Sequence, residues 1–221
     1  MARQATLRRR VEQAPSEPKK APVFGGGEPP APPSSHAAPI ISNARLGLLM
    51  FLAAEAMFFS GLIGAFLVFR LGNPVWPPPF QPRLPLAVTG INTVILLASG
   101  LTMRLALKRV RAGSQGGLKL HLVTTAGLGV IFLGIQGYEW ARLLHFGLTI
   151  SSGIYGATFY TLIGTHALHV LGAVLWLGVI LFQALQRRFT NTSYAGVELC
   201  AMYWTFVVGL WPLLYGLVYF R

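Results

Sequence analysis

Long apolar stretches separated by short polar connections occupy most of the chain and predict its architecture. They lie at about 46–69, 86–107, 120–142, 154–185 and 197–220. Several exceed the roughly 18 apolar residues that mark a membrane-spanning helix. The pattern therefore predicts an all-α, polytopic membrane bundle of five transmembrane helices over residues 45–221.

Residues 1–44 have a different composition from the rest of the chain. This segment holds eight of the 15 prolines and six of the 18 Lys and Arg residues, with few large apolar side chains. Such a segment cannot bury enough apolar surface to offset its ordering entropy, so we expect a disordered, Pro-rich basic tail. The connection from Pro74 to Pro85 is also rich in proline and cannot be helical.

The basic residues indicate how the helices are oriented. Of the 18 Lys and Arg residues, 14 lie in three places: the tail including Arg45, the connection after the second span and the connection after the fourth span. The other connections and the C-terminus hold four. The positive-inside rule therefore places the N-terminus in the cytoplasm and the C-terminus outside. An odd number of spans requires the same arrangement.

Composition excludes several kinds of chemistry. Hydrophobic residues make up 53% of the chain and charged residues 11%, and the single cysteine is Cys200. One cysteine permits neither a disulfide nor a CxxCH haem attachment, and no phosphate-binding or nucleophile motif is present. The net charge is +12, and the basic residues lie between the spans rather than along one face. This distribution favours a signal for membrane topology over nucleic-acid binding. We therefore expect no catalytic residues, metal or cofactor in this chain.

Glu55 is the acidic residue that is hardest to explain in a lipid environment. It lies about ten residues into the first span, where a charge costs at least about 2.5 kcal/mol. We predict that its carboxyl is neutral at pH 7 and contacts a histidine of the fourth span. A purely structural carboxyl that is hydrogen-bonded to a neighbouring helix is the alternative. The small residues Ala56, Ser60 and Gly64 form a stripe on the other side, which suits close helix contact.

His166 and His169 are three residues apart, so both project to one side of the fourth helix. We expect them to hydrogen-bond to Glu55 or to backbone carbonyls of neighbouring helices. A metal site is less favoured, because sites in helix bundles need four or more ligands from several helices and the other spans offer few.

Other polar and aromatic residues lie close to the ends of the spans or within them. Glu139 and Glu198 are near helix ends, where an acid costs little, so a solvated or lipid-facing position and a functional role are equally open. Four further residues are candidates for lipid or packing contacts: Arg70, Trp140, Trp204 and Trp211.

Four motifs, in a preserved order over about residues 45–221, resemble a known family. The segment EAMFFSGL from Glu55 resembles S/A-E-x-M/L-F-F-x-G, and QGYEW from Gln136 is similar to Q-x-x-E-Y/W. The segment GATFYTLIGTHALHV from Gly156 resembles G-S-T-F-F-x-x-T-G-F-H-G-L-H-V. Glu198 and the aromatic residues after it resemble E-x-x-x-W-Y-W-H-F-V-D-V-V-W. These are motifs of subunit III of the haem–copper terminal oxidases, the cytochrome c and quinol oxidases, and the length matches the short five-helix bacterial form.

The resemblance implies a non-catalytic accessory subunit of a bacterial respiratory oxidase in the plasma (inner) membrane. Family members pack beside subunit I, in a complex with subunit II and other respiratory subunits, and bind phospholipid in a cleft between helices. They support proton uptake and resistance to inactivation during turnover, while the haems and copper belong to the partner. Glu55 matches the membrane glutamate known in this family for carbodiimide reactivity, and His166 and His169 match its F-H-G-L-H element.

The chain departs from the family in two respects. Longer members have seven helices, so this chain corresponds to a form without the first two. The family's H-F-V-D is replaced by TFVV at residues 205–208.

Other functions remain open at the level of sequence. The related small subunit of a nitric oxide reductase shares these motifs. A proton-coupled transporter could use Glu55 and His169 as a relay, although five spans without a visible repeat argue against it. A di-metal membrane enzyme is the third alternative.

Overall fold

Five α-helices form the part of the chain that the computed structural model describes, residues 42–79 and 84–220. Their bounds are α1 (Asn43–Gly72), α2 (Leu86–Arg111), α3 (Gln115–His145), α4 (Ile154–Leu185) and α5 (Ala195–Tyr219). Each is long and apolar enough to cross a membrane, and no strand occurs among these residues. The predicted all-α membrane bundle of five helices is confirmed. Most of the tail expected at residues 1–44, residues 1–41, lies outside the described residues. The last two positions of that expected tail belong to α1, which begins at Asn43.

Local capping and turn residues fix where the helices begin and reverse. The hydroxyl of Ser42 accepts a hydrogen bond from the Arg45 amide at 3.4 Å, and Ser114 accepts one from the Gly117 amide at the same distance. Serine is favoured at such positions because its oxygen satisfies an amide that has no partner within the helix. Between α2 and α3 the chain turns at Gly113, whose φ of +73° is readily adopted by glycine.

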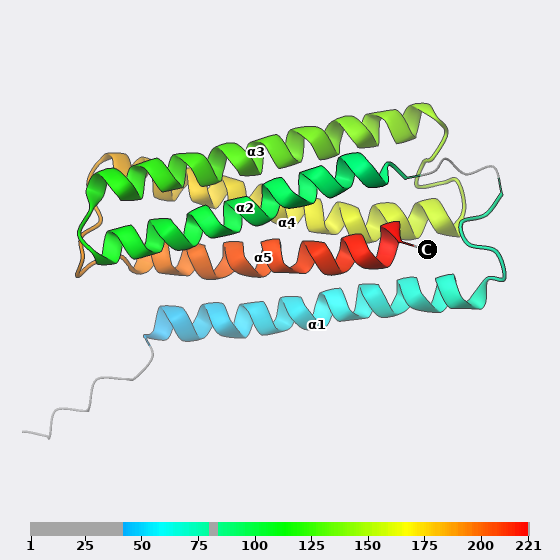
Figure 1. The fold of residues 1–221 in the computed structure, drawn as a ribbon. Helices are drawn as coiled ribbons and strands as arrows, with labels where there is room; N and C mark the ends of the chain where they lie inside the picture. The colour runs from blue at the N-terminus through cyan, green and yellow to red at the C-terminus, as the bar shows by residue number, and fades with distance from the viewer. Residues whose placement is uncertain (1–41, 80–83, 221) are drawn as a thin grey trace, which may run out of the picture. The chain divides into compact units, whose positions relative to one another are not determined.

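The helices run alternately in opposite directions, so each end of the bundle gathers the termini of all five (Figure 1). Helix α2 packs on α3 and α5, and α4 packs on α3 and α5. Fully buried aromatic residues such as Phe132, Trp204 and Trp211 fill the space between these four helices. At Gly129 a Cβ atom would lie 2.7 Å from the Trp204 ring, so only glycine lets α3 pack this closely against that side chain of α5.

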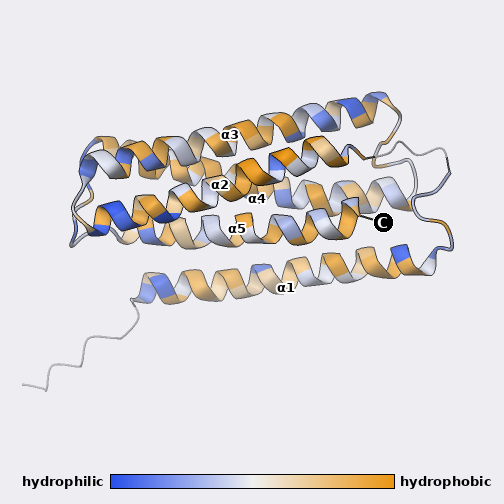
Figure 2. Ribbon diagram, in the orientation of Figure 1, coloured by the Kyte–Doolittle hydropathy of each residue, from blue (hydrophilic) through white to orange (hydrophobic). Residues whose placement is uncertain are grey.

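The outward surface of the helices is strongly apolar. Figure 2 shows hydrophobic residues along all five helices, with hydrophilic residues concentrated towards their ends. Large apolar side chains such as Met57 (77% exposed) and Leu168 point away from the bundle. A helix that is hydrophobic on its outer face as well as its inner face is typical of a membrane span.

Helix α1 lies at the margin of the bundle and contacts only α4 and α5 among the described helices. Its only buried side chains are Phe59 and Phe66. The stripe of Ala56, Ser60 and Gly64, expected to make a close helix contact, is exposed and meets no other described helix. Phe59 and Phe66 offer more apolar area to the bundle than the small residues do, so they lie on its inward face.

Candidate functional site

The carboxyl of Glu55 and the imidazole of His169 form a contact in the middle of α1 and α4. Glu55 Oε2 lies 2.8 Å from His169 Nε2, and the other ring nitrogen, Nδ1, lies 2.8 Å from the Thr165 carbonyl oxygen. The side chains are 17% and 18% exposed. The contact between Glu55 and a fourth-helix histidine that the sequence predicts is therefore present, and His169 provides it.

The hydrogen-bond pattern restricts where protons can sit on this Glu55–His169 pair. A carbonyl oxygen only accepts, so Nδ1 of His169 carries a hydrogen that it donates to Thr165. The bond between Nε2 and Glu55 Oε2 then needs one more hydrogen, held by either atom. The pair is thus either a carboxylic acid with a neutral imidazole or a carboxylate with an imidazolium. Both states have no net charge, which is the condition a membrane interior favours.

Aromatic rings lie close to the Glu55–His169 pair. The ring of Phe59 meets the His169 ring edge-on at 5.0 Å between centroids, and the Phe58 ring lies 6.5 Å away. Tyr203 of α5 lies close enough to Glu55 to interact with it electrostatically. Because these neighbouring rings are apolar and lower the local dielectric, the hydrogen bond is stronger than the same contact at an aqueous surface.

His166 is not part of this pair, although it lies one turn away on the same helix. It is fully buried in the bundle and stacks on the Trp211 ring at 5.1 Å between centroids. Neither ring nitrogen has a hydrogen-bond partner among the described residues. The structure therefore brings one of the two predicted histidines to Glu55 and directs the other into the core.

The two other acids among the described residues are held by arginines. Glu139 is only 4% exposed, and its Oε1 lies 3.3 Å from the guanidinium of Arg142. The solvated or lipid-facing position considered for Glu139 is therefore wrong, since its side chain lies on the side of α3 that faces the bundle. Glu198 is partly exposed and lies 3.2 Å from Arg111 and 3.7 Å from Arg45.

No group of three or more His, Cys, Asp or Glu side chains gathers among the residues that the structure describes. The Glu55–His169 pair offers two such side chains. The hydrogen bond between them places one proton between a carboxyl and an imidazole.

Comparison with known proteins identifies the family. Residues 32–221 match the family of cytochrome c oxidase subunit III. A protein of Synechocystis sp. named cytochrome c oxidase subunit 3 is 36% identical over 174 residues, 78% of this chain and 73% of the relative. Proteins of the same name from Damaliscus lunatus and Prototheca wickerhamii are each 35% identical and are covered over 72% of their length, with 83% and 84% of this chain aligned. This chain belongs to the cytochrome c oxidase subunit III family.

Membership of the subunit III family confirms the resemblance read from the motifs. It also supports the general function that the resemblance implies, which is that of a non-catalytic accessory subunit of a haem–copper oxidase. The apolar helices agree with a multi-pass membrane protein.

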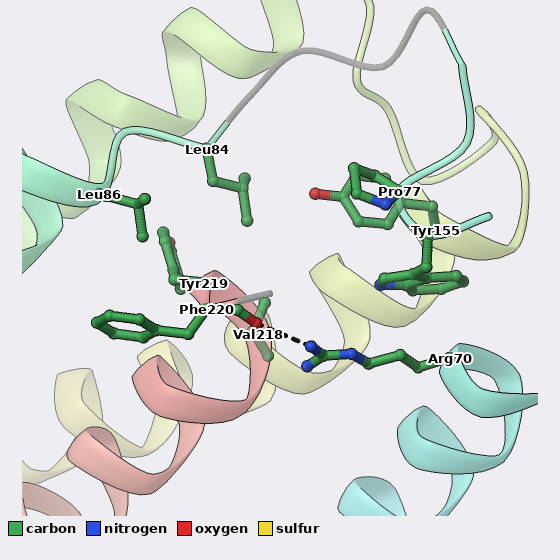
Figure 3. A pocket seen from close by; sticks show the side chains of 9 residues that line it. Arg70, Pro77, Leu84, Leu86, Tyr155, Val218, Tyr219 and Phe220 are labelled. Carbon is green, nitrogen blue, oxygen red and sulfur yellow. Dashed lines mark hydrogen bonds between the residues drawn. The ribbon is translucent and has the colours of Figure 1, made fainter.

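Arg70 joins two helices of this subunit III chain at the end of the bundle where α1 finishes. Its guanidinium donates to the carbonyl oxygen of Leu217 in the last turn of α5 and, at 2.9 Å, to that of Phe220 directly after the helix. Figure 3 shows the bond to Phe220. The last carbonyls of a helix lack amide partners within the helix, and a cation there also interacts favourably with the helix dipole. Arg70 thus makes a packing contact between α1 and α5 and satisfies carbonyl oxygens at the end of α5.

The cavity beside Arg70 has a volume of about 400 Å³. Tyr155 and Tyr219 line it together with Trp76 and Pro77 of the proline-rich connection (Figure 3).

The tryptophans named from the sequence also make packing contacts. Trp204 donates to Ser99 Oγ at 3.2 Å and Trp211 to Thr93 Oγ1 at 2.9 Å, both in the core. Trp140 is half-buried and packs edge-on against Tyr160 at 5.8 Å. These contacts connect α5 to α2 and α3 to α4.

Sequence reasoning missed a line of buried polar residues on α2. Thr89, Asn92, Thr93 and Ser99 are all buried. The Asn92 amide donates to the Phe132 carbonyl of α3 at 3.1 Å. The signal was available, because small polar residues at spacings of three to seven within an apolar span mark a helix-facing side.

Proposed function

We propose that this chain is the accessory subunit III of a bacterial respiratory terminal oxidase and that its Glu55–His169 pair sustains proton uptake by the catalytic subunit. In this proposal the chain packs against subunit I, in a complex that also holds subunit II and other respiratory subunits. The haems and copper belong to those partners, phospholipid is retained beside this chain, and the complex lies in the plasma (inner) membrane.

The observation that carries the proposal is the 2.8 Å contact between Glu55 Oε2 and His169 Nε2. This distance lies within the range over which a proton passes directly between two side chains. The Thr165 carbonyl holds the imidazole in place, so a transfer needs no rearrangement of the ring. The pair is partly exposed at the surface of the bundle, where a neighbouring subunit or a water molecule can exchange a proton with it.

The test is the substitution Glu55→Gln in the assembled oxidase. The glutamine amide can still donate a hydrogen bond to His169, but it cannot release a proton. We expect normal haem content and an initial rate of oxygen consumption that changes little. The lifetime of the enzyme during continuous turnover should shorten by a larger factor than the initial rate falls.

Glu139→Gln is the matched control, because it neutralises a buried acid at the end of α3, away from the pair. It should leave the lifetime during turnover as in the unmodified enzyme. Complete loss of oxygen reduction in a properly assembled Glu55→Gln complex, or an unchanged lifetime, would contradict the proposal.

A further inference from the structure

The cavity beside Arg70 is continued into the bundle by buried polar side chains. Leu86, the first residue of α2, and Tyr219, the last residue of α5, both line this cavity (Figure 3). Tyr219 is buried, and its hydroxyl lies within interaction range of the Thr89 and Gln136 side chains. Thr89 is three residues further along α2 and is also buried. Polar groups therefore lead from the cavity into the space between the helices.

Two amide side chains at the inner end of this line lack hydrogen-bond partners. Asn92 of α2 is fully buried, and its Nδ2 donates to the Phe132 carbonyl at 3.1 Å, but its Oδ1 has no partner among the described residues. Gln136 of α3 is buried as well, and its Nε2 has no partner there either. In an α-helix the amide four residues later bonds to the same carbonyl, and here that residue is Gln136. An unpaired acceptor and an unpaired donor thus lie at one level of the bundle.

The size and chemistry of this region suit water. Buried polar groups are almost always hydrogen-bonded, to protein or to ordered water. The cavity of about 400 Å³ has room for several water molecules, since each takes about 30 Å³ in the liquid. Tyr155 and Tyr219 contribute phenol groups to its lining. Asn92 lies six residues beyond Leu86, about 9 Å along the axis of α2, which a short file of water molecules spans.

His166 also has unpartnered nitrogens, but its surroundings are different. Its ring stacks on Trp211 at 5.1 Å between centroids and lies 6.5 Å from the Phe59 ring. Aromatic faces give a water molecule no strong hydrogen-bond partner, and a stable buried water needs two to four polar partners. The core around His166 and Trp211 is therefore a dry reference within the same molecule.

From this arrangement we infer that water fills the cavity and continues past Tyr219 to Asn92 and Gln136. This hydrated inlet, from the cavity to the two amides, admits water and protons into the bundle from the end where α1 finishes. An acyl chain in the same space would leave both amides without partners, so the occupant is water rather than lipid. The inlet goes beyond the proposed function and does not include the Glu55–His169 pair.

The first measurement uses the assembled, unmodified oxidase in lipid nanodiscs. Short X-ray pulses convert water to hydroxyl radicals where it stands, and mass spectrometry then locates the oxidised side chains. Tyr155 and Tyr219 are each 5% exposed, and Trp211 is fully buried. We expect oxidation of both tyrosines to rise with X-ray dose, because ordered water lies beside them, while Trp211 stays at background.

The second measurement tests the inner end of the inlet with single cysteines in the assembled complex. Thr89→Cys and Gln136→Cys place a thiol in the inlet, Ala173→Cys places one in the core of α4, and Gly134→Cys places one on the exposed face of α3. A positively charged methanethiosulfonate should modify the two inlet thiols at least about tenfold faster than the two control thiols, because only a hydrated thiolate reacts. The parent chain, whose Cys200 is buried, gives the background. Haem content shows that each complex is assembled.

Three results would overturn the inference. The first is oxidation of Tyr219 no faster than that of Trp211. The second is modification of Thr89→Cys and Gln136→Cys as slow as that of Ala173→Cys. The third is rapid reaction of the inlet thiols with uncharged N-ethylmaleimide but not with the charged reagent, which would indicate an apolar occupant. Neither measurement depends on turnover, so a failure of the inlet is distinguishable from a failure of the proposed function.

Discussion

At the scale of single residues, the two histidines of α4 show how strongly position within the bundle decides the role of a side chain. Both ring nitrogens of His169 have partners, Glu55 and the Thr165 carbonyl. Neither nitrogen of His166 has one among the described residues. Burying a polar group without a partner costs about 1–3 kcal/mol, so His166 weakens the core in which it lies.

Replacing each histidine by phenylalanine should therefore have opposite effects. In His166→Phe the aromatic ring can still stack on Trp211, and the loss of two unpaired nitrogens should leave stability unchanged or raise it by up to about 1–3 kcal/mol. In His169→Phe the Glu55 carboxyl loses its partner, and stability should fall by a similar amount. Thermal unfolding of the purified complex measures both. A larger loss for His166→Phe than for His169→Phe would contradict this account.

The sequence predicted that Glu55 meets a fourth-helix histidine, but it could not select which one. Residues three apart in a helix differ by 300° of rotation, or 60° in the other sense. That difference is enough for His166 to face Trp211 while His169 faces Glu55. The rotation of α4 about its own axis makes the choice, and it depends on packing against α1 and α5 together.

The position of Glu139 was left open for a related reason. Its place near the end of an apolar run is compatible with a solvated or lipid-facing position as well as with a functional role. In the folded chain Tyr219 of α5 lies close enough to interact electrostatically with it. An electrostatic interaction between residues that are 80 positions apart leaves no trace in the local sequence pattern.

At the scale of elements, α1 is the least firmly packed helix and is held by polar contacts at three levels. Arg45 pairs with Glu198 near the start of α5, Glu55 contacts His169 of α4, and Arg70 bonds to the end of α5. Only two of its side chains are buried. Apolar helices gain little from association within lipid, so these polar contacts are important for the position of α1.

Arg70→Gln should loosen the ends of both helices that Arg70 joins. A cation at a helix C-terminus contributes about 0.3–1 kcal/mol, so amide exchange in the last turn of α5 should accelerate by up to about fivefold. The C-terminal turns of α1 should follow, while α3 should not change. Hydrogen-exchange mass spectrometry of the complex in lipid nanodiscs measures this, with Lys108→Gln as the control. Equal acceleration in all helices would indicate general destabilisation instead.

The helices themselves were the most predictable feature, because apolar runs of this length have few alternatives to a membrane span. Their ends were less so. Helix α3 begins at Gln115, before its apolar run, because Ser114 caps it. The outward face of α1 was assigned to helix contact from its small residues, but which side of a helix packs depends on its neighbours as well as on its own composition.

At the scale of the whole molecule, the basic residues gather at one end of the bundle. The starts of α1, α3 and α5 and the ends of α2 and α4 meet there, and this end carries Arg45, Arg111 and Lys119. A groove of about 480 Å³, lined by Arg45, Arg104, Arg111 and Glu198 among others, lies at the same end. The charge that predicts orientation thus also surrounds this groove.

Orientation is testable by thiol labelling, since the single native cysteine, Cys200, is buried. Ala112→Cys lies at the end of α2, and His145→Cys lies at the opposite end of the bundle; both positions are exposed. With the N-terminus in the cytoplasm, a membrane-impermeant maleimide should label His145→Cys in intact cells and Ala112→Cys only after permeabilisation. The parent chain should remain unlabelled in both. The reverse pattern would place the arginines on the outer surface. The charge excess would then have to serve lipid or protein binding rather than topology, because the positive-inside rule would not hold for this chain.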